Sequence, residues 1–569
     1  MKIPYLGRIN LNWCSSCNVP VLAGRCGACG RATNKVPITP PGDVRPAFEK
    51  DIEAVNRASE GQFGSPLVTD ERIVLLNSVP GLDRFDEVIV DGAVVGALRY
   101  DVEKLRLEFM PRIEGAARLW RKGAKGFVEV AGDASEYIRN GKSVLMPGVV
   151  DFDRGIREGQ EVIVACGDLA IAVGRARFSG EEAMHREKGM FVKVRKYLKD
   201  ESLEVPPGGQ DWDLVVNANR EVLEVHEKES LSFIKKTIES NELPVIVSFS
   251  GGKDSLATLL LVRKVAEPKV IFIDTGLEFP ETLEYVKEMA TFLGVELITT
   301  GAGDRFWSGL EVFGMSGRDY RWCCKVCKLG PVAKIMHERF PRGILNFVGQ
   351  RRYESVVRAR SGNLWRNSWL PRQLSASPIQ EWNALHIWLY LMKEGVEVNP
   401  LYSLGLERIG CWLCPSSSLY EIEVLKELHP DLWQGFEKAL SAQGYSEEEV
   451  RAGFWRWRRM PKGQVELKER LKVESGMRKE FHLSSPKDME RAKGIASSLG
   501  GAVTDDILLR SALCLGCGVC LAHCEYGAIE FQGGKVWLNS KCKGCRRCHL
   551  RCPIVKYIYG DTIINNHDN

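Results

Sequence analysis

The chain has 569 residues, enough for several domains of roughly 100–200 residues each. Lys and Arg number 78 against 74 Asp and Glu, so the net charge of +4 gives no chain-wide nucleic-acid signature and any RNA site must be local. No apolar run approaches the roughly 20 residues of a membrane span, and the N-terminus lacks the apolar core of a signal peptide. The 18 cysteines fall mostly in C-x2-C groups, which favours metal or iron–sulfur ligation in a reducing cytoplasm.

Residues 1–36 contain two cysteine pairs, and glycines stand at the turns between them. Cys14 and Cys17 form the first pair, and Cys26 and Cys29 form the second. Four thiolates on two tight loops suit a tetrahedral zinc ion. The pattern therefore predicts a zinc ribbon with a structural or docking role, and a rubredoxin-like iron site is the alternative.

Residues 37–140 begin with a Pro-rich linker and continue as a mixed α/β module to which the sequence assigns no role. Apolar residues at 88–90 and 93–95 flank Asp91-Gly92, which predicts a β-hairpin with a tight turn.

Residues 141–205 show short apolar segments separated by glycine-containing turns, which predicts a small β-barrel. The progression from Pro147 to Tyr197 resembles a PUA domain, and this resemblance implies RNA binding. The basic residues that would meet phosphates are Lys188, Lys193, Arg195, Lys196 and Lys199. Cys166 has no cysteine neighbour in the sequence and is expected in the core of the barrel.

Residues 215–463 contain the most informative stretch. A β-branched run, Val245–Val247, ends in Ser250, Gly251, Gly252, Lys253, Asp254 and Ser255, and a helical pattern follows. Glycines let backbone N–H groups converge on an anion, and the helix N-terminus adds its positive dipole end. Lys253 can neutralise phosphate charge, and the two serines can donate hydrogen bonds. The loop is therefore predicted to bind phosphate, although its spacing is not that of a Walker loop.

Strand-like segments at 245–249, 270–274, 295–299 and 344–348 alternate with helical segments, one of them near 281–293. This order predicts an α/β domain with a doubly wound parallel sheet, whose ligands bind outside the carboxyl ends of the strands. Asp274 ends the second strand. Arg351 and Arg352 follow the fourth strand, where they can reach phosphate or sulfate oxygens.

The sequence SGGKDS resembles the PP-loop of the adenosine nucleotide α-hydrolase-like fold. Further segments in the same order resemble the PAPS/APS reductase family: they lie at 270–282, 349–358, 378–382, 399–402 and 410–415. The resemblance implies binding of ATP, APS or PAPS, with Asp274 near the nucleoside.

Five cysteines of this domain pose a metal question. In cluster-bearing APS reductases an adjacent cysteine pair and a distant C-x2-C hold one 4Fe–4S cluster, and Cys323, Cys324, Cys411 and Cys414 match that pattern. Cys327 allows a second set with Cys324, Cys411 and Cys414, for either zinc or a cluster. A third arrangement uses three protein ligands and an open iron that delivers sulfide, as in iron–sulfur tRNA thiolases.

The sequence departs from these reductases at one place. Their nucleophilic cysteine lies in a C-terminal ECGLH-like motif, whereas the next cysteine here after Cys414 is Cys514. The segment 451–459, RAGFWRWRR, resembles the region just before that motif. Its aromatic and basic residues are expected either to stack on RNA or to pack on the domain.

Residues 464–505 are predicted to form a helical connector, and 506–562 resemble a bacterial two-cluster ferredoxin. In this pattern the fourth cysteine of each run ligates the other cluster. The first set is Cys514, Cys517, Cys520 and Cys552, and the second is Cys524, Cys542, Cys545 and Cys548. Such clusters transfer single electrons, so the resemblance implies an electron donor.

Three functions are compatible with these patterns. We favour ATP-dependent thiolation of RNA through an adenylated intermediate. The second is an APS or PAPS reductase that releases sulfite with electrons from the ferredoxin-like region, and the third is a non-catalytic iron–sulfur RNA-binding protein. The expected catalytic residues are Lys253, Asp254, Arg351, Arg352 and Cys327.

Overall fold

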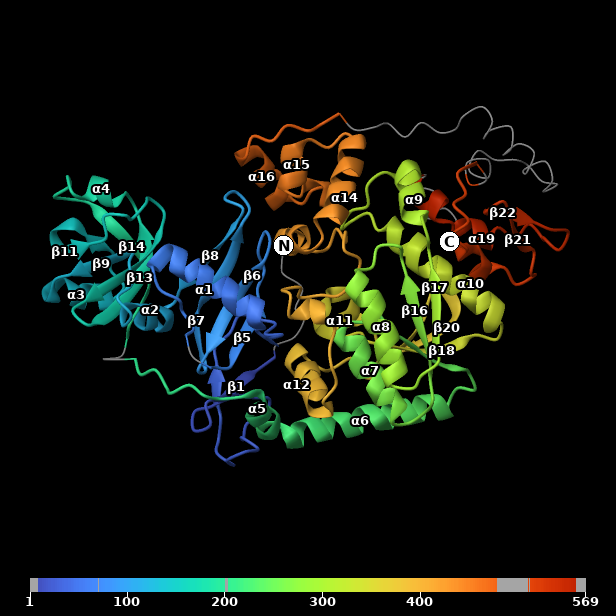
Figure 1. Ribbon diagram of the computed structural model, residues 1–569, viewed down its shortest axis with the longest axis horizontal. Helices are drawn as coiled ribbons and strands as arrows, with labels where there is room; N and C mark the ends of the chain where they lie inside the picture. The colour runs from blue at the N-terminus through green and yellow to red at the C-terminus, as the bar shows by residue number, and fades with distance from the viewer. Residues whose placement is uncertain (1–8, 70, 200–202, 478–509, 511, 559–569) are drawn as a thin grey trace. The chain divides into compact units, whose positions relative to one another are not determined.

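The computed structural model describes residues 9–69, 71–199, 203–477, 510 and 512–558 (Figure 1). The chain divides into two compact units. Unit 1 comprises Met1–His226, Trp382–Glu397 and Ser403–Gly405, and unit 2 comprises Glu227–Glu381, Val398–Tyr402 and Leu406–Asn569. Parts of the predicted helical connector and of the ferredoxin-like region, including 478–509, lie outside the described residues.

The N-terminal cysteine pairs of unit 1 lie on and beside a small antiparallel sheet with strand order β2-β1-β3. The strands are β1 (Leu11–Cys14), β2 (Val19–Val21) and β3 (Asn34–Val36). Their buried side chains share one apolar cluster with Leu385 and Leu389 of α12 (Ala384–Glu394). A helix from the middle of the sequence therefore completes the core around this N-terminal sheet.

A five-stranded antiparallel sheet follows in unit 1, in the order β4-β5-β6-β7-β8. Its strands are β4 (Arg45–Pro46), β5 (Val74–Ser78), β6 (Phe85–Val90), β7 (Ala93–Asp101) and β8 (Arg106–Pro111), and its helices are α1 (Glu49–Phe63) and α2 (Ile113–Trp120). The predicted hairpin is confirmed: β6 and β7 are joined by Asp91 and Gly92, with φ of 53° and 75°. Two consecutive positive φ angles match the right-handed twist of the paired strands.

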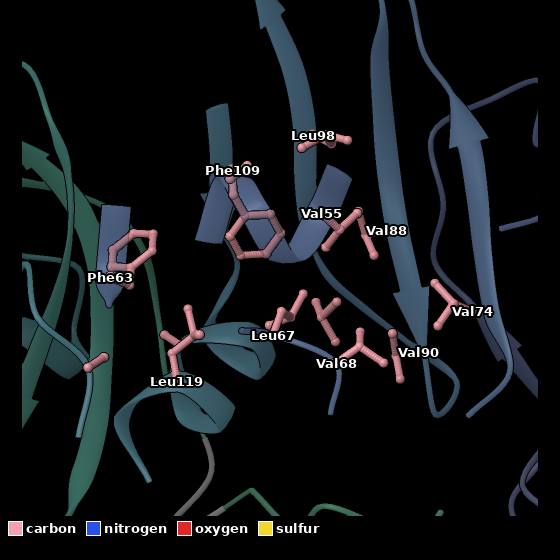
Figure 2. Packing of buried hydrophobic residues seen from close by; sticks show 14 of the residues in the cluster. Val55, Phe63, Leu67, Val68, Val74, Val88, Val90, Leu98, Phe109 and Leu119 are labelled. Atoms are coloured by element: carbon pink, nitrogen blue, oxygen red, sulfur yellow. The ribbon is translucent and has the colours of Figure 1, made fainter. Parts of the chain in front are cut away.

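The core of this sheet is shown in Figure 2, where Phe63, Phe109 and Leu119 gather with the valines of β5 and β6. The ring of Phe109 leaves no space opposite it: a Cβ on Gly96 of β7 would lie 2.3 Å from its Cζ atom. Ile163, Ala170 and Val173 of the next sheet belong to the same cluster. The α/β module and that sheet therefore share one continuous core.

The third sheet of unit 1 has six strands in the order β10-β14-β13-β12-β9-β11. Its elements are β9 (Phe127–Val130), α3 (Gly132–Arg139), β10 (Val144–Leu145), η1 (Met146–Gly148), β11 (Val149–Phe152), β12 (Glu161–Cys166), β13 (Leu169–Ala176), α4 (Gly180–Ala183) and β14 (Met190–Tyr197). The sheet begins at Phe127, earlier than residue 141, because the short strand β9 pairs with both β12 and β11. A four-residue strand before a helix carries too little periodicity to reveal this pairing.

Unit 2 is built on a sheet with strand order β17-β16-β15-β18-β20-β19, which is parallel except for the edge strand β19. Its strands are β15 (Val245–Ser248), β16 (Lys269–Asp274), β17 (Leu297–Gly301), β18 (Ile344–Val348), β19 (Leu364–Asn367) and β20 (Leu370–Ala376). All four strands predicted for this domain are confirmed within two residues at either end. The chain order reverses at β15, which has β16 on one side and β18 on the other, and such a switch point is the usual ligand position in doubly wound sheets.

Helices lie along and beyond this sheet (Figure 1). They are α6 (Arg220–Glu239, of which Glu227 onward belongs to this unit), α7 (Lys253–Arg263), α8 (Pro280–Phe292), α9 (Arg305–Phe313), η2 (Cys324–Leu329), α10 (Gly330–Arg339), η3 (Arg352–Glu354), α11 (Val356–Arg360), η4 (Pro400–Tyr402), α13 (Leu419–Leu428), α14 (Pro430–Ala442), α15 (Glu447–Arg451), η5 (Phe454–Arg456) and α16 (Lys462–Arg470). The helix α5 (Trp212–Ala218) belongs to unit 1, where Val215 and Ala218 join the apolar cluster of the N-terminal sheet. No helix among the described residues is long and apolar enough to cross a membrane.

The C-terminal module, residues 512–558, completes the described part of unit 2. It contains η6 (Val519–His523), β21 (Ile529–Gln532), β22 (Lys535–Leu538), α19 (Arg547–Leu550) and α20 (Pro553–Ile558). The module packs against α10 through η6, and Ala522 joins the apolar cluster of the central sheet. Figure 1 shows it in red beside α9 and α10.

We expect Phe109→Ala to lower the free energy of unfolding by about 3–5 kcal/mol, because the ring is fully buried against Gly96 and leaves a cavity. Urea unfolding monitored by circular dichroism measures the change. Tyr137→Ala removes an aromatic side chain that is 67% exposed and should stay within about 0.5 kcal/mol of the parent protein. Equal effects of the two substitutions would contradict the assigned core.

Candidate functional site

The phosphate loop lies between β15 and α7, at the carboxyl edge of the central sheet. Gly251 has a φ of 75°, which few other residues adopt, and Gly252 is the N-cap residue of α7. Gly349, after β18, packs so closely that a Cβ there would lie 2.4 Å from the carbonyl carbon of Asp254. The loop and the segment after β18 are therefore held together by backbone contact, as the sequence predicted for neighbouring strand ends.

A buried ionic triad fixes the start of α7. Asp254 Oδ2 accepts from Lys253 Nζ at 2.9 Å, and Asp254 Oδ1 accepts from Arg351 Nε at 2.6 Å. Burial alone would raise the pKa of Asp254, but Lys253 and Arg351 outweigh it and hold that pKa well below its usual range. Burial alone would lower the pKa of Lys253, but the negative charge of Asp254 outweighs it, and the pKa of Lys253 is raised. Asp254 thus positions both cations at the loop and favours the charged form of Lys253.

Tyr402 is a component of the loop that the sequence analysis quoted only as part of a motif. The backbone N–H of Lys253 donates to its hydroxyl at 2.9 Å, and the side chain is buried. Asn399 Nδ2 donates to Thr282 Oγ1 at 3.1 Å and so ties the same segment to α8. The segment 399–402 therefore closes one side of the loop; its resemblance to the family motif was the only available signal.

Asp274 and Arg352 lie in different environments from the triad. Asp274, at the end of β16, accepts from the Gly276 N–H at 2.8 Å and so supports the turn after that strand. Arg352 is half-buried and pairs with Glu381 at 2.8 Å. Of the two predicted arginines, the structure therefore brings only Arg351 into contact with a residue of the phosphate loop.

The turn after β16 also contacts the central cysteines. Thr275 Oγ1 lies 3.3 Å from Cys411 Sγ, and Thr275 also donates to Glu278 at 2.8 Å. One short turn thus joins the nucleotide edge of the sheet, through Asp274, to the cysteine site, through Thr275.

Cys324 and Cys327 lie in η2, a π-helix at residues 324–329 that runs directly into α10. Wide π turns are rare and occur frequently at functional sites. Arg321, which precedes this helix, donates to Cys324 Sγ at 3.4 Å and lies 4.0 Å from Cys414 Sγ. Two cysteine pairs that are far apart in the sequence therefore meet around one guanidinium group.

Cations surround these sulfur atoms. A hydrogen bond from Cys323 is the main cause that lowers the pKa of Cys324, and Arg321 adds to it. The charge on Cys411 is the main cause that raises the pKa of the half-buried Lys328. Sequence reasoning missed Arg321 and Lys328, because only the fold brings both of them to Cys411 and Cys414.

Cys327 differs from the other four central cysteines because it is only 2% exposed. Burial raises its pKa to about 12, and the negative sulfurs of Cys411, Cys324 and Cys517 act in the same direction. Cys517 belongs to the C-terminal module. The structure therefore positions Cys327 between the central cysteines and that module.

The N-terminal cysteines have the geometry of a mononuclear metal site. The four sulfur atoms of Cys14, Cys17, Cys26 and Cys29 lie within 4.8 Å of one another, with Cys14 and Cys29 at 3.5 Å and Cys17 and Cys26 at 3.9 Å. Four sulfurs placed tetrahedrally about 2.3 Å from a zinc ion are about 3.8 Å apart. Among the residues that the structure describes, no other group of cysteines is this compact. The central cysteines do not form a group of this compactness.

The C-terminal module contains a cavity that all four cysteines of the first predicted set line: Cys514, Cys517, Cys520 and Cys552. Backbone N–H groups of Gly516 and Val536 each point at Cys514 Sγ at 3.4 Å, as expected around a thiolate ligand. Phe313 and Val326 of the central domain line the same cavity. Of the second set, Cys524 and Cys548 pack in one apolar cluster, whereas Cys542 and Cys545 are exposed.

The aromatic and basic segment 451–459 is packed on the domain. Trp455 and Arg456 are each 1% exposed, and Arg456 donates to the carbonyl of Ser417 at 2.6 Å. The backbone N–H groups of Arg458 and Arg459 both donate to Asp319. Of the two alternatives for this segment, packing on the domain is therefore the one that the structure shows for its central residues.

Comparisons with known proteins agree with this architecture. Residues 244–417 match the phosphoadenosine phosphosulfate reductase domain, and residues 126–198 match the PUA domain. The central domain belongs to the phosphoadenosine phosphosulfate reductase domain family. The PUA match includes β9, in agreement with the sheet.

Two uncharacterized proteins of Methanocaldococcus jannaschii are similar to this chain over most of its length. One is 39% identical over 80% of this chain and 97% of its own length, and the other is 32% identical over 75% and 98%. An adenosine 5′-phosphosulfate reductase of Lysinibacillus sphaericus is 23% identical over 38% of this chain and 91% of its own length.

Cys14→Ser combined with Cys17→Ser should remove one metal ion per chain, because it deletes half of the compact sulfur set. Elemental analysis of the purified protein measures the loss and identifies the metal. Cys166→Ser, in β12, is the matched control and should leave the metal content unchanged. Loss of several irons rather than one ion would contradict a mononuclear site.

Cys411→Ser combined with Cys414→Ser should remove about four of about twelve irons, if the central set and both C-terminal sets each hold a 4Fe–4S cluster. Iron and zinc are determined on the anaerobically purified protein. An unchanged iron content with one zinc ion lost would assign the central cysteines to zinc.

Proposed function

We propose that this protein is a sulfonucleotide reductase, which cleaves APS or PAPS to sulfite and the corresponding adenosine phosphate. One observation carries the proposal: the C-terminal cysteine module packs directly on the helix that bears Cys324 and Cys327. A module of the kind that transfers single electrons is thereby in contact with the cysteines beside the nucleotide loop. Thiolation by adenylation, which the sequence alone favoured, gives no comparable reason for this contact.

The charges at the loop support an anionic nucleotide. Lys253 and Arg351 lie on one carboxylate, Asp254, which leaves this buried group of three with one net positive charge. The N-terminus of α7 and the glycine backbone of the loop add donors for phosphate oxygens. Ser250, Gly251, Gly252, Lys253 and Ser255 therefore bind the phosphate groups. Asp254 positions the two cations, and Arg351 stabilises the phosphate that leaves.

The cysteines present fit iron–sulfur groups by their chemistry and their spacing. Cys323, Cys324, Cys411 and Cys414 would hold the central cluster, and the two C-terminal sets would hold one cluster each. Bound clusters supply single electrons. Arg321 and Lys328 keep positive charge beside the central sulfurs and favour the approach of a negatively charged sulfonucleotide.

The reaction balances without a thiol nucleophile from the family motif. Two electrons reduce sulfur from the +6 to the +4 state, and the bond between sulfur and the phosphate oxygen breaks. The oxygen leaves with the bonding pair, so the fully ionised products are sulfite and the adenosine phosphate, and no proton is consumed. The sequence contains no ECGLH-like cysteine, and Cys327 is buried among other sulfurs, those of Cys411, Cys324 and Cys517.

A second function, sulfur transfer to RNA, is favoured by the PUA domain at residues 126–198. ATP would then bind the same loop, and a base carbonyl would be adenylated before sulfur replaces AMP. The two functions differ in the nucleotide that the loop selects.

Anaerobic titration calorimetry with APS, PAPS and ATP tests this choice. We expect tight binding of one sulfonucleotide and weak binding of ATP. Lys253→Ala should weaken that binding at least about 10-fold, equivalent to about 1.4 kcal/mol, while the iron content stays constant.

Lys269→Ala is the matched control, because Lys269 lies on the neighbouring strand β16 and pairs with Glu296 on the surface. It should bind the sulfonucleotide as the parent protein does. Tight binding of ATP with no response to APS or PAPS would refute the reductase and support RNA thiolation.

A further inference from the structure

The two C-terminal cysteine sets differ in how far the central domain covers them. Phe313 and Val326 line the cavity of the first set, and the backbone of Gly330 packs on the carbonyl of Cys517. Cys520 and Cys552 are buried. The first set is therefore the inner one, and an external protein cannot reach it from the side of the central domain.

The second set lies at the surface of the module. Residues 540–547 form an unbroken exposed run that contains Cys542 and Cys545. Arg546 has a φ of 57°, and α19 starts directly after it at Arg547. A thiolate-bound group at this outer set would lie just beneath an open loop, within reach of a docked protein.

The charge of this loop is one-sided. Residues 512–558 contain seven Lys and Arg against two Glu, and four of the seven basic residues lie in the exposed run: Lys541, Lys543, Arg546 and Arg547. Arg547 pairs with Glu525. Neither Lys541 nor Lys543 has a side-chain hydrogen bond or ion pair among the described residues. The loop thus presents unneutralised positive charge around the two exposed cysteines.

We propose that the loop Lys541–Arg547 is the docking surface for an acidic one-electron carrier protein. The proposal rests on the reductase function above and names its partner. Each docking event oxidises one carrier by one electron, and two events supply the electrons for one sulfonucleotide. Cys542 and Cys545 mark the entry side, and Cys517 beside Cys327 marks the exit side toward the central cysteines. Opposite charges on loop and carrier accelerate the encounter by roughly 10- to 1,000-fold at low salt.

Stopped-flow mixing of the cluster-loaded full chain with a reduced acidic ferredoxin tests the proposal, with bleaching of the iron–sulfur absorbance as the readout. Lys541→Glu combined with Lys543→Glu should lower the second-order rate constant at least about 10-fold at low salt. Lys541→Gln combined with Lys543→Gln should give a smaller decrease. In about 1 M salt, where the screening length is about 3 Å, the rates should converge.

The control is Lys228→Glu combined with Lys235→Glu on α6, which makes the same change of charge on exposed residues of another element. It should alter the rate less than about two-fold. Iron content and absorbance of every variant are checked first, so that loss of the clusters is not read as loss of docking.

Equal rates for the parent and the loop variants, or rates that do not depend on salt, would overturn the proposal. No nucleotide is present in this measurement, so its result is separate from the nucleotide titration. Tight APS or PAPS binding with equal rates for the loop variants would keep the reductase and refute the docking loop. Slowed loop variants without APS or PAPS binding would keep the docking loop and refute the reductase.

Discussion

The close packing of Gly330 and Gly518 brings the C-terminal module against the helix that contains Cys327. A Cβ on Gly330 would lie 2.3 Å from the carbonyl oxygen of Cys517, and a Cβ on Gly518 would lie 2.7 Å from the side chain of Lys334. Gly518 also has a φ of 95°. The backbone of Gly330, which begins α10 directly after the helix of Cys327, therefore lies against the backbone of Cys517 in the inner cysteine set. Electron transfer weakens steeply with distance, so this contact decides whether the module can serve the central site.

The strand order of the central sheet brings the phosphate loop close to the central cysteines. β15 lies between β16 and β18, so the phosphate loop, the Asp274 turn and the segment around Arg351 meet at one edge. Thr275 then links that edge to Cys411. A sulfonucleotide bound through its phosphates at the loop would extend its sulfur along this turn. The fold thereby brings the phosphate loop and the central cysteines, which come from distant parts of the sequence, to one region of the domain, as the proposed function requires.

The strands, the phosphate loop, the Asp91-Gly92 hairpin and the grouping of cysteines could be predicted from the sequence, because periodicity, turn glycines and ligand spacing are short-range properties. Tertiary contacts could not be predicted from such local signals. Asp254 was assigned to phosphate binding, yet its carboxylate holds Lys253 and Arg351. Arg456 is a residue type that often contacts RNA, but here its guanidinium group is buried and donates a hydrogen bond to the carbonyl of Ser417.

Positive charge is common to the phosphate loop, the central cysteine site and the outer loop Lys541–Arg547. Sulfonucleotides and thiolate-bound clusters are both anionic, so a site that joins them requires cations that stay charged without water. Arg321 and Lys328 meet this requirement, because the sulfurs themselves raise the pKa of both groups. The same principle operates at the triad, where the charge of Asp254 raises the pKa of Lys253 against the effect of burial. Under the proposed function, positive charge at the outer loop would attract the carrier, and positive charge inside would hold the substrate. The same sign of charge would then serve electron entry, the central cluster and the nucleotide in unit 2.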